Sequence, residues 1–545
     1  MWGTLFMLTS GRVSRREWYW AIGVAFLVVM IATMPYVVAW LAAPTGKCYT
    51  GLLVNPLDGH SYLAKMQQGA AGEWLFRLPF TPEIQQGAFL FTYYLFLGHL
   101  SSLFGIPLIF MFHIARCLAG MLLLLTVYRF VAEFWVELEQ RRVAFLIVAL
   151  SSGLGWVLAI FGTVGVDLWV PESNTFYSIF VNPHFPLAEA LMLLIFMAAA
   201  APLDGKEAAV PCSSSRTLAR DIGRCLLCVM ASLALVCVQP FAVLVVYPVL
   251  GVFLLWRSST GNRWLTPAWI RTFCAGVASF PLVFYYSGVS RNDPIFAAWS
   301  VQNITPTPAL WAVLAGYGFL ILLAGLGGVW CFRRRRGFFL LIWVGVNLVL
   351  LYTPFALQRR LLLGFHIPVA MLASCGVVGV LWTWFRSRQR AVSTGVLLIL
   401  LPTTLFVLLV QIAGAMQAKW PLYMTADENG ALRWLKDATT TDELVVASPQ
   451  MGLMIPAWAG NRVVYGHPFE TVRAEQRKAD VENFFSGRTA PDDFFGDYDV
   501  SYVFVGSHER ALGESGLAWS ADSRYPVAYS NAEVLIYRIS RGQRN

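Results

Sequence analysis

Charged residues are scarce in this chain of 545 residues: only 13% are charged, whereas 57% are hydrophobic. Soluble domains typically carry about 25% charged residues, so the composition excludes an ordinary soluble protein. Apolar runs of membrane-spanning length recur along the sequence. They predict a helical protein that crosses a membrane many times.

Two further features are missing, a disulfide framework and an internal repeat. The nine cysteines show no disulfide pattern, and residues 417–545 contain none. Cys225 and Cys228 form a C-x-x-C, but they lie within an apolar run and not beside a soluble βαβ pattern, so a redox role is not indicated. Many transporters are built from repeats, so the lack of one favours another class of membrane protein.

Net positive charge is concentrated in the first three quarters of the chain. Residues 1–416 contain 27 Lys and Arg against 14 Asp and Glu, a net charge of +13, whereas residues 417–545 contain 13 against 17, a net charge of −4. Cytoplasmic loops of membrane proteins are rich in Lys and Arg, so we attribute the excess to topology and expect no nucleic-acid partner. Arg12, Arg15 and Arg16 precede the first apolar run and predict a cytoplasmic N-terminus. That run, about residues 18–43, is too long for the apolar region of a signal peptide and lacks a convincing cleavage site, so we expect a retained first helix.

The apolar runs predict a transmembrane domain over residues 1–416 with 11 to 13 helices. Ser and Gly in SSGLG, residues 151–155, predict a break that makes two short crossings there. With a cytoplasmic N-terminus, the first helix places the first loop, 44–87, outside the cytoplasm. An odd total number of helices places the C-terminal region outside as well. The helices after the first are expected near 88–104, 107–134, 143–163, 184–203, 222–238, 240–256, 267–286, 308–331, 338–356, 362–385 and 391–416.

Residues 417–545 have the pattern of a small α/β domain. ADENGALRWLKD has the spacing of an amphipathic helix, and LVVAS, RVVYG and YVFVG have the composition of short buried strands. A charged helix and a terminal hairpin follow. Strands that alternate with helices predict a partly parallel sheet.

The first loop carries an unusual polar stretch, NPLDGHSYLAKMQQGAAGEW, residues 55–74. It predicts a short amphipathic helix along the membrane interface. Asp58 stands at its start, where an Asp is often simply a helix cap. The other interpretation is a functional carboxylate at the membrane face.

The order of residues in this loop resembles the first outer loop of GT-C glycosyltransferases. The pattern is Asp58-x-x-x-Tyr62, then Met66, then Gly72-Glu73-Trp74. QQGAFLFTYYLF and FHIARCLAG extend the similarity over roughly residues 15–165. The nearest branch is that of the protein O-mannosyltransferases and the lipid A aminoarabinose transferases. Gly59 follows Asp58 where that branch has a second acid.

The resemblance implies a polytopic enzyme that uses a polyprenyl-phosphate sugar. In such enzymes an acceptor hydroxyl attacks the anomeric carbon in a single displacement, with inversion at that carbon, and the lipid phosphate leaves. Asp58 is the candidate base, with Glu83 and Glu73 as further catalytic carboxylates and Tyr62 as a substrate contact. Asp58 and His60 are candidate ligands of a divalent metal ion, the cofactor that such a set suits.

Two later outer loops add candidates for substrate binding. Asn182, His184 and Glu189 stand at the start of an apolar helix, and an acid in such a helix indicates function or a buried arginine partner. Arg359 and Arg360 lie in a predicted outer loop, against the positive-inside tendency. Guanidinium groups suit phosphate, so these two are candidates for the donor phosphate.

The sequence therefore predicts a transferase of the cytoplasmic membrane that acts on its extracytoplasmic side. Its partners would be a polyprenyl-phosphate sugar, membrane lipid and a glycan, lipid or protein acceptor. Two other classes stay open: a transporter or flippase of a lipid-linked or anionic substrate, and a non-catalytic membrane scaffold.

Overall fold

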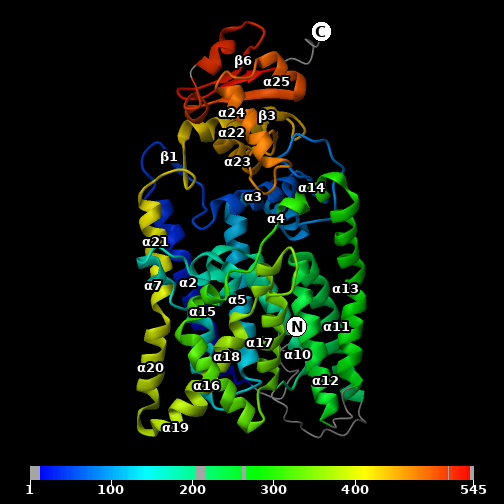
Figure 1. Cartoon of the computed structure of the whole chain (residues 1–545), viewed down its shortest axis with the longest axis vertical. Coiled ribbons are helices and arrows are strands. Elements are labelled where there is room, and N and C mark those ends of the chain that lie inside the picture. The colour runs from blue at the N-terminus through cyan, green and yellow to red at the C-terminus, as the bar shows by residue number, and fades with distance from the viewer. Residues whose placement is uncertain (1–12, 204–214, 261–265, 514, 540–545) are drawn as a thin grey trace. The chain divides into compact units, whose positions relative to one another are not determined.

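The computed structural model describes residues 13–203, 215–260, 266–513 and 515–539 (Figure 1). The chain forms two compact units, each built from segments that are distant in sequence. The first unit comprises residues 1–35, 115–285 and 305–410. The second comprises residues 36–114, 286–304 and 411–545.

The first unit is a bundle of apolar helices (Figure 1). Four of its helices continue into the second unit, because the unit boundaries fall inside them. The longer helices are α2 (Arg15–Leu41), α5 (Leu108–Val131), α6 (Leu138–Leu150), α10 (His184–Ala200), α11 (Ser215–Val238), α12 (Val243–Ser259), α13 (Thr266–Asn292), α15 (Leu310–Tyr317), α16 (Phe319–Arg334), α17 (Phe338–Leu351), α18 (His366–Gly376), α20 (Gln389–Leu400) and α21 (Pro402–Met416). Short elements join them: α7 (Gly155–Ile160), α8 (Val166–Trp169), η1 (Pro171–Ser173), α9 (Thr175–Val181), η2 (Pro240–Ala242), η4 (Gln358–Leu362), η5 (Val377–Leu381), α19 (Trp382–Trp384) and η6 (Arg386–Arg388).

The chain is a multi-pass membrane protein by the length and apolar composition of its helices. Among the described residues, 7 helices are long and apolar enough to span a bilayer, or up to 9 if each of two bent pairs is one span. Two shorter apolar helices, His184–Ala200 and Phe338–Leu351, accompany them. If both bent pairs and both shorter helices also cross, the total is 11, the lower predicted count.

The break predicted at SSGLG is confirmed, but its consequence differs from the prediction. α6 ends at Leu150 and α7 begins at Gly155. The backbone N–H groups of Gly153 and Gly155 both donate to Oδ2 of Asp167, each at 3.1 Å. The Asp167 carboxylate thus replaces, for these two N–H groups, the carbonyl partners that a continuous helix would supply. α7 has only 6 residues, about 9 Å of helix, too short to cross alone. Residues 138–160 therefore count as one candidate span and not as two crossings.

Two other predicted helices are bent. Residues 308–331 were expected to form one helix, but α15 and α16 meet at an angle of 86°. Gly318 joins them with a φ of 47°, a conformation that other residues rarely adopt. α20 and α21 meet at 41°, where Pro402 removes a backbone N–H donor from the helix.

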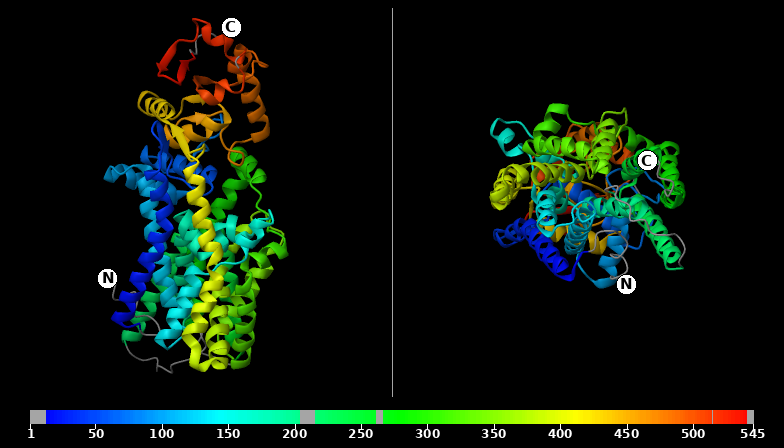
Figure 2. Two further views of the ribbon diagram at one scale, coloured as in Figure 1. Left: turned by 90° about the vertical axis from the view of Figure 1, so that its left-hand side faces the viewer. Right: turned by 90° about the horizontal axis from the view of Figure 1, so that it is seen from below.

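α18 is fully buried in the first unit, and α16 packs along it (Figure 1). Their backbones approach closely at glycines: a Cβ on Gly327 would lie 1.8 Å from the carbonyl oxygen of Leu372. Figure 2 shows the helices from the side and from below. At the start of α18, His366 is buried and both its ring nitrogens are bonded, Nε2 to Ser151 and Nδ1 to Thr175. Because the ring is buried and both its nitrogens are bonded, His366 has a structural role.

The second unit contains the mixed sheet expected near the C-terminus. Its strand order is β4-β3-β5-β7-β6, with β3 parallel to β4 and β5 and with β7 antiparallel to β5 and β6. Thr425 and Glu428 form a capping box at the start of the predicted amphipathic helix. The elements are α22 (Ala426–Ala438), β3 (Leu444–Val446), α23 (Pro449–Trp458), β4 (Arg462–Val463), α24 (Ala474–Phe485), α25 (Pro491–Asp497), β5 (Val500–Val505), α26 (Ser507–Arg510), η7 (Ser515–Ala521), β6 (Val527–Ser530) and β7 (Leu535–Arg538).

The first loop belongs to this second unit and is joined to its C-terminal part at several points. β1 (Lys47–Tyr49) pairs antiparallel with β2 (Tyr423–Thr425). The N–H of Val463, in strand β4, donates to the carbonyl of Pro79 at 3.0 Å. The loop also contains α3 (Pro56–Ala70), which is followed by α4 (Thr92–Phe104), and α14 (Pro294–Gln302) completes the unit.

Candidate functional site

The polar stretch that begins near residue 55 forms helix α3, as predicted, but its cap differs. Asn55 is the N-cap, with a left-handed backbone, and its side-chain oxygen accepts from the N–H of Asp58 at 3.5 Å. The interpretation of Asp58 as the cap is therefore wrong. Asp58 stands in the first turn, where a carboxylate interacts favourably with the helix dipole.

α3 is a packed helix of the second unit, because α4 and α23 both contact it. Its contact with α4 is a close backbone crossing: a Cβ on Gly69 would lie 2.0 Å from the carbonyl oxygen of Leu95, and one on Gly98 would lie 2.0 Å from that of Met66. Tyr62 stacks on Tyr94 with ring centroids 4.5 Å apart. Most of α3 is thus covered by protein, unlike the amphipathic interfacial helix that the sequence predicted.

Asp58 lies between a residue of its own loop and a residue of the C-terminal domain. Its Oδ2 accepts from the side-chain amide of Asn55 at 2.5 Å. Its Oδ1 lies 3.7 Å from Nε2 of His467, which follows strand β4. The Asp58 side chain is 43% exposed, so a substrate can reach this carboxylate.

A buried ion pair lies further along α3. Nζ of Lys65 is 2.8 Å from Oε1 of Glu470, and the two side chains are 1% and 12% exposed. Ser61 also donates a hydrogen bond to Glu470. The Lys65 ammonium stands over three aromatic rings, the nearest being Phe91 at 4.4 Å. Burial acts to raise the pKa of Glu470, but the charge of Lys65 and the bonds to it outweigh burial and lower that pKa.

The two other predicted catalytic carboxylates have different surroundings. Oε1 of Glu83 forms an ion pair with Arg477 at 2.7 Å, and Thr81 donates to the same carboxylate. Burial acts to raise the pKa of Glu83, but these hydrogen bonds prevail and lower it, so Glu83 is an ionised partner of Arg477. Glu73 is exposed in the loop after α3.

The metal prediction for Asp58 and His60 depends on the donors available. Nδ1 of His60 is 2.6 Å from the carbonyl oxygen of Pro56, which leaves a buried Nε2 without a hydrogen-bond partner. Burial lowers the pKa of His60 to about 4, so the ring is neutral at pH 7. Protein metal sites generally use three or more side chains, however, and across the described residues no group of three or more His, Cys, Asp or Glu is placed to hold an ion. We therefore derive no step through a metal, and its use stays a prediction.

The candidates in the loop before α10 lie in the first unit. Asn182 ends α9, His184 begins α10, and both are buried. Glu189 is 1% exposed, hydrogen-bonds to Ser178 and lies near the buried carboxylate of Glu172. Its second oxygen, Oε2, has no hydrogen-bond partner. Among the described residues, the hydrogen-bond partner of Glu189 is therefore Ser178. A structural role was expected to pair Glu189 with an arginine instead.

Arg359 and Arg360 lie on η4, also in the first unit. Each guanidinium rests on an aromatic face, Arg359 at 4.8 Å from the ring of Trp169 and Arg360 at 5.4 Å from that of Phe241. Both side chains are half-buried, and Nε of each is buried without a hydrogen-bond partner. Across the described residues, neither arginine forms an ion pair with a carboxylate. The two cations can therefore bind an anion from outside the protein.

Sequence reasoning gave little weight to the residues that the C-terminal part brings to α3. His467 and Glu470 belong to VVYGHPFET, which the pattern describes only as the end of a strand. The available signal was three polar residues directly after a buried strand, Tyr465, His467 and Glu470. Lys65 was the complementary signal, a cation on the predicted helix.

Solved structures with the same fold exist among membrane glycosyltransferases. ArnT from Cupriavidus metallidurans bound to undecaprenyl phosphate matches with a TM-score of 0.55 at 12% identity, over 95% of this chain and 98% of that chain. The arabinofuranosyltransferase AftD from mycobacteria matches with a TM-score of 0.53 at 15% identity, over 98% of this chain but only 41% of that chain. No protein-family model and no curated protein matches the sequence. The structural matches confirm the predicted GT-C fold.

Proposed function

We propose that this protein is a glycosyltransferase of the cytoplasmic membrane. It would transfer a sugar from a polyprenyl-phosphate donor to a hydroxyl group of a glycan, lipid or protein on the extracytoplasmic side. The GT-C fold and the similarity to ArnT, which was solved with undecaprenyl phosphate, support this class of enzyme. The observation that carries the lipid-phosphate donor is the pair Arg359 and Arg360, two neighbouring guanidiniums with aromatic neighbours and no carboxylate partner among the described residues.

The proposed reaction is a single displacement at the anomeric carbon. The acceptor oxygen forms a bond to that carbon while the bond from the carbon to the phosphate oxygen breaks. The electron pair of the broken bond leaves with the polyprenyl phosphate. Asp58 takes the proton of the acceptor hydroxyl, a role that its exposed carboxylate in the first turn of α3 suits.

The arginines would bind the donor and stabilise the charge that grows on the leaving phosphate. A guanidinium can give two parallel hydrogen bonds to phosphate oxygens, and its stacking on an aromatic ring fixes its plane. Such fixed cations stabilise developing charge without reorganisation. Tyr62 and the buried polar residues Asn182, His184 and Glu189 stay candidates for sugar or acceptor contacts.

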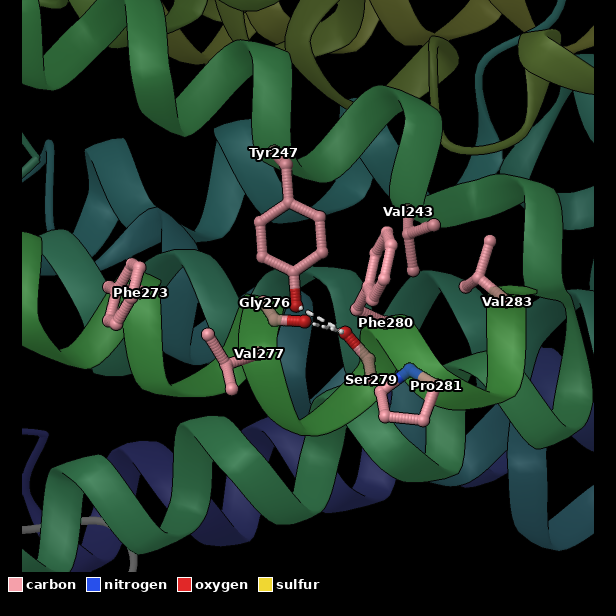
Figure 3. Close-up of a pocket in the computed structure, with 9 residues that line it drawn as sticks. All are labelled: Val243, Tyr247, Phe273, Gly276, Val277, Ser279, Phe280, Pro281 and Val283. Carbon is pink, nitrogen blue, oxygen red and sulfur yellow. Dashed lines mark hydrogen bonds between the residues drawn. The ribbon is translucent and has the colours of Figure 1, made fainter. Parts of the chain in front are cut away.

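An apolar groove in the first unit supports a lipid donor. The ring under Arg360 belongs to Phe241 of η2, and α12 begins directly after η2. Val243 and Tyr247 of α12, with apolar residues of α13, line a groove of about 530 Å³ (Figure 3). The Tyr247 hydroxyl is bonded to Ser279 at 2.9 Å, which leaves the groove with apolar walls such as an isoprenoid chain would contact. The α13 residues are Phe273, Gly276, Val277, Ser279, Phe280, Pro281 and Val283.

Replacing either arginine is expected to weaken binding of the lipid phosphate. Hydrogen bonds to charged groups contribute about 1.5–3 kcal/mol, so Arg359→Ala or Arg360→Ala should each raise the Kd for undecaprenyl phosphate roughly 10- to 100-fold. The measurement is titration of the purified protein in detergent, followed by native mass spectrometry. Arg433→Ala, which removes an exposed arginine of α22, is the control and should bind as the wild type does. Unchanged binding by both variants would contradict the proposed phosphate site.

A further inference from the structure

His467, which lies beside Asp58 in space, is more than 400 residues away in the sequence. His467 is 1% exposed and follows strand β4 in the C-terminal domain, and its Nε2 lies 3.7 Å from Oδ1 of Asp58. Phe80 packs against its ring, with centroids 5.5 Å apart. Because both residues belong to the second unit, this proximity is part of one compact body.

The backbone around His467 fixes which ring nitrogen carries the proton. Nδ1 accepts from the N–H of Phe469 at 3.1 Å and from that of Glu470 at 3.2 Å. A nitrogen that accepts two hydrogen bonds has no proton of its own, so the proton of the neutral ring must be on Nε2. Nε2 is buried without a hydrogen-bond partner, and it faces Asp58 as a donor.

His60, the other histidine near this position, has the opposite arrangement. Its Nδ1 is 2.6 Å from the carbonyl of Pro56, and a carbonyl can only accept, so Nδ1 carries the proton. Nε2 of His60 is then an acceptor and cannot donate to a carboxylate. Of the two rings, only His467 can supply an N–H to Asp58.

We infer that His467 is a positioning residue for Asp58, an inference that rests on the proposed function. Asn55 donates to Oδ2 of Asp58, and the N–H of His467 faces Oδ1. The two donors, one at each oxygen, therefore favour one orientation of the carboxylate. The distance of 3.7 Å is longer than a hydrogen bond, and contacts of this kind commonly shorten when substrate binds. The His467 ring is fixed by two backbone hydrogen bonds, whereas the Asp58 side chain is 43% exposed. The C-terminal domain thereby completes the surroundings of the catalytic base.

Two substitutions of His467 separate this role from a purely structural one. Asparagine places an oxygen where Nδ1 is, so His467→Asn keeps the acceptor for the two backbone N–H groups but has nothing at Nε2. Glutamine places an amide N–H near Nε2, so His467→Gln keeps the donor to Asp58 but loses the backbone anchor.

The positioning role predicts a definite order of activities. A misplacement of a reacting group by about 1 Å can lower the rate by about 100-fold. His467→Asn should therefore lower kcat by about this factor with KM within roughly twofold, and His467→Gln should recover most of kcat. The assay measures release of undecaprenyl phosphate from an undecaprenyl-phosphate sugar, with a cell-membrane extract as acceptor. The reverse order, with wild-type kcat for His467→Asn and a loss for His467→Gln, would show that His467 only anchors its loop.

A second measurement does not depend on activity. Labelling the histidine rings with ¹⁵N shows which nitrogen of His467 is protonated, and His467→Asn assigns the signals. We expect a neutral ring with the proton on Nε2, and a shift of the Nε2 signal in Asp58→Ala. A proton on Nδ1, or an Nε2 signal that Asp58→Ala leaves unchanged, would overturn the inference. A wild-type protein that releases no polyprenyl phosphate would instead contradict the proposed function. The ¹⁵N result would still decide whether Nε2 of His467 donates to Asp58.

Discussion

Asp58→Asn should reduce the release of polyprenyl phosphate by roughly 100- to 10,000-fold, the range that a general base contributes. The amide has nearly the shape of the carboxylate, and the position is partly exposed, so the fold should be kept. An amide cannot take the proton of the acceptor hydroxyl, which is the reason for the loss. The measurement is kcat in the release assay, together with the apparent Tm of the purified protein.

The control for this prediction is Asp437→Asn, the same chemical change at an exposed position of α22. It should leave both kcat and the apparent Tm unchanged. If Asp58→Asn retained wild-type kcat, Asp58 would not be the base, although the GT-C fold would stand.

Breaking the buried pair between Lys65 and Glu470 should have the largest effect on stability. Removing one partner of a buried ion pair leaves an uncompensated charge and typically costs about 3–5 kcal/mol. Glu470→Leu should therefore lower the free energy of unfolding by about that amount, seen as a fall in apparent Tm. The double variant Lys65→Met with Glu470→Leu should recover most of the loss, because no charge is then left buried.

The exposed pair Arg77 and Asp442 supplies the comparison. Its atoms are 3.6 Å apart and its side chains are 42% and 78% exposed, so Asp442→Ala should cost less than about 1 kcal/mol. The contribution of the buried pair depends on pH. The pKa of Glu470 is lowered below its usual 4.5, so its stabilising effect is complete above about pH 4.5 and is lost as the pH falls through the lower folded value. The stability difference between wild type and Glu470→Leu should thus persist at pH 5 and shrink only in stronger acid.

The sequence predicted the parts of the fold that depend on local pattern. Long apolar runs gave the spanning helices, and the helix after Thr425 was predictable because its amphipathic spacing is explicit. The bend at Gly318 was not predictable in the same way. A glycine in an apolar run can break a helix, as Gly318 does, or allow close packing, as Gly327 does, and only the surrounding structure decides.

The family resemblance proposed Asp58 for the candidate site, and local patterns proposed Glu189, Arg359 and Arg360. Asp58 is at the start of a helix in both the prediction and the structure, but the residues around it are not local. Lys65 and Glu470 are 405 positions apart, and a pair of this separation leaves no periodic signal in one sequence. The same holds for Glu83, whose partner Arg477 is 394 positions away. The close association of the first loop with the C-terminal domain is therefore a finding of the structure.

The most direct test of the central claim uses the wild-type protein in lipid nanodiscs. Undecaprenyl-phosphate sugars are supplied one at a time with a cell-membrane extract as acceptor, and ³¹P NMR follows the change from sugar phosphodiester to free undecaprenyl phosphate. We expect one class of donor to be consumed by the wild type, with Asp58→Asn at least about 100-fold slower. A wild-type protein that binds undecaprenyl phosphate but consumes none of the donors would contradict the proposed transferase function.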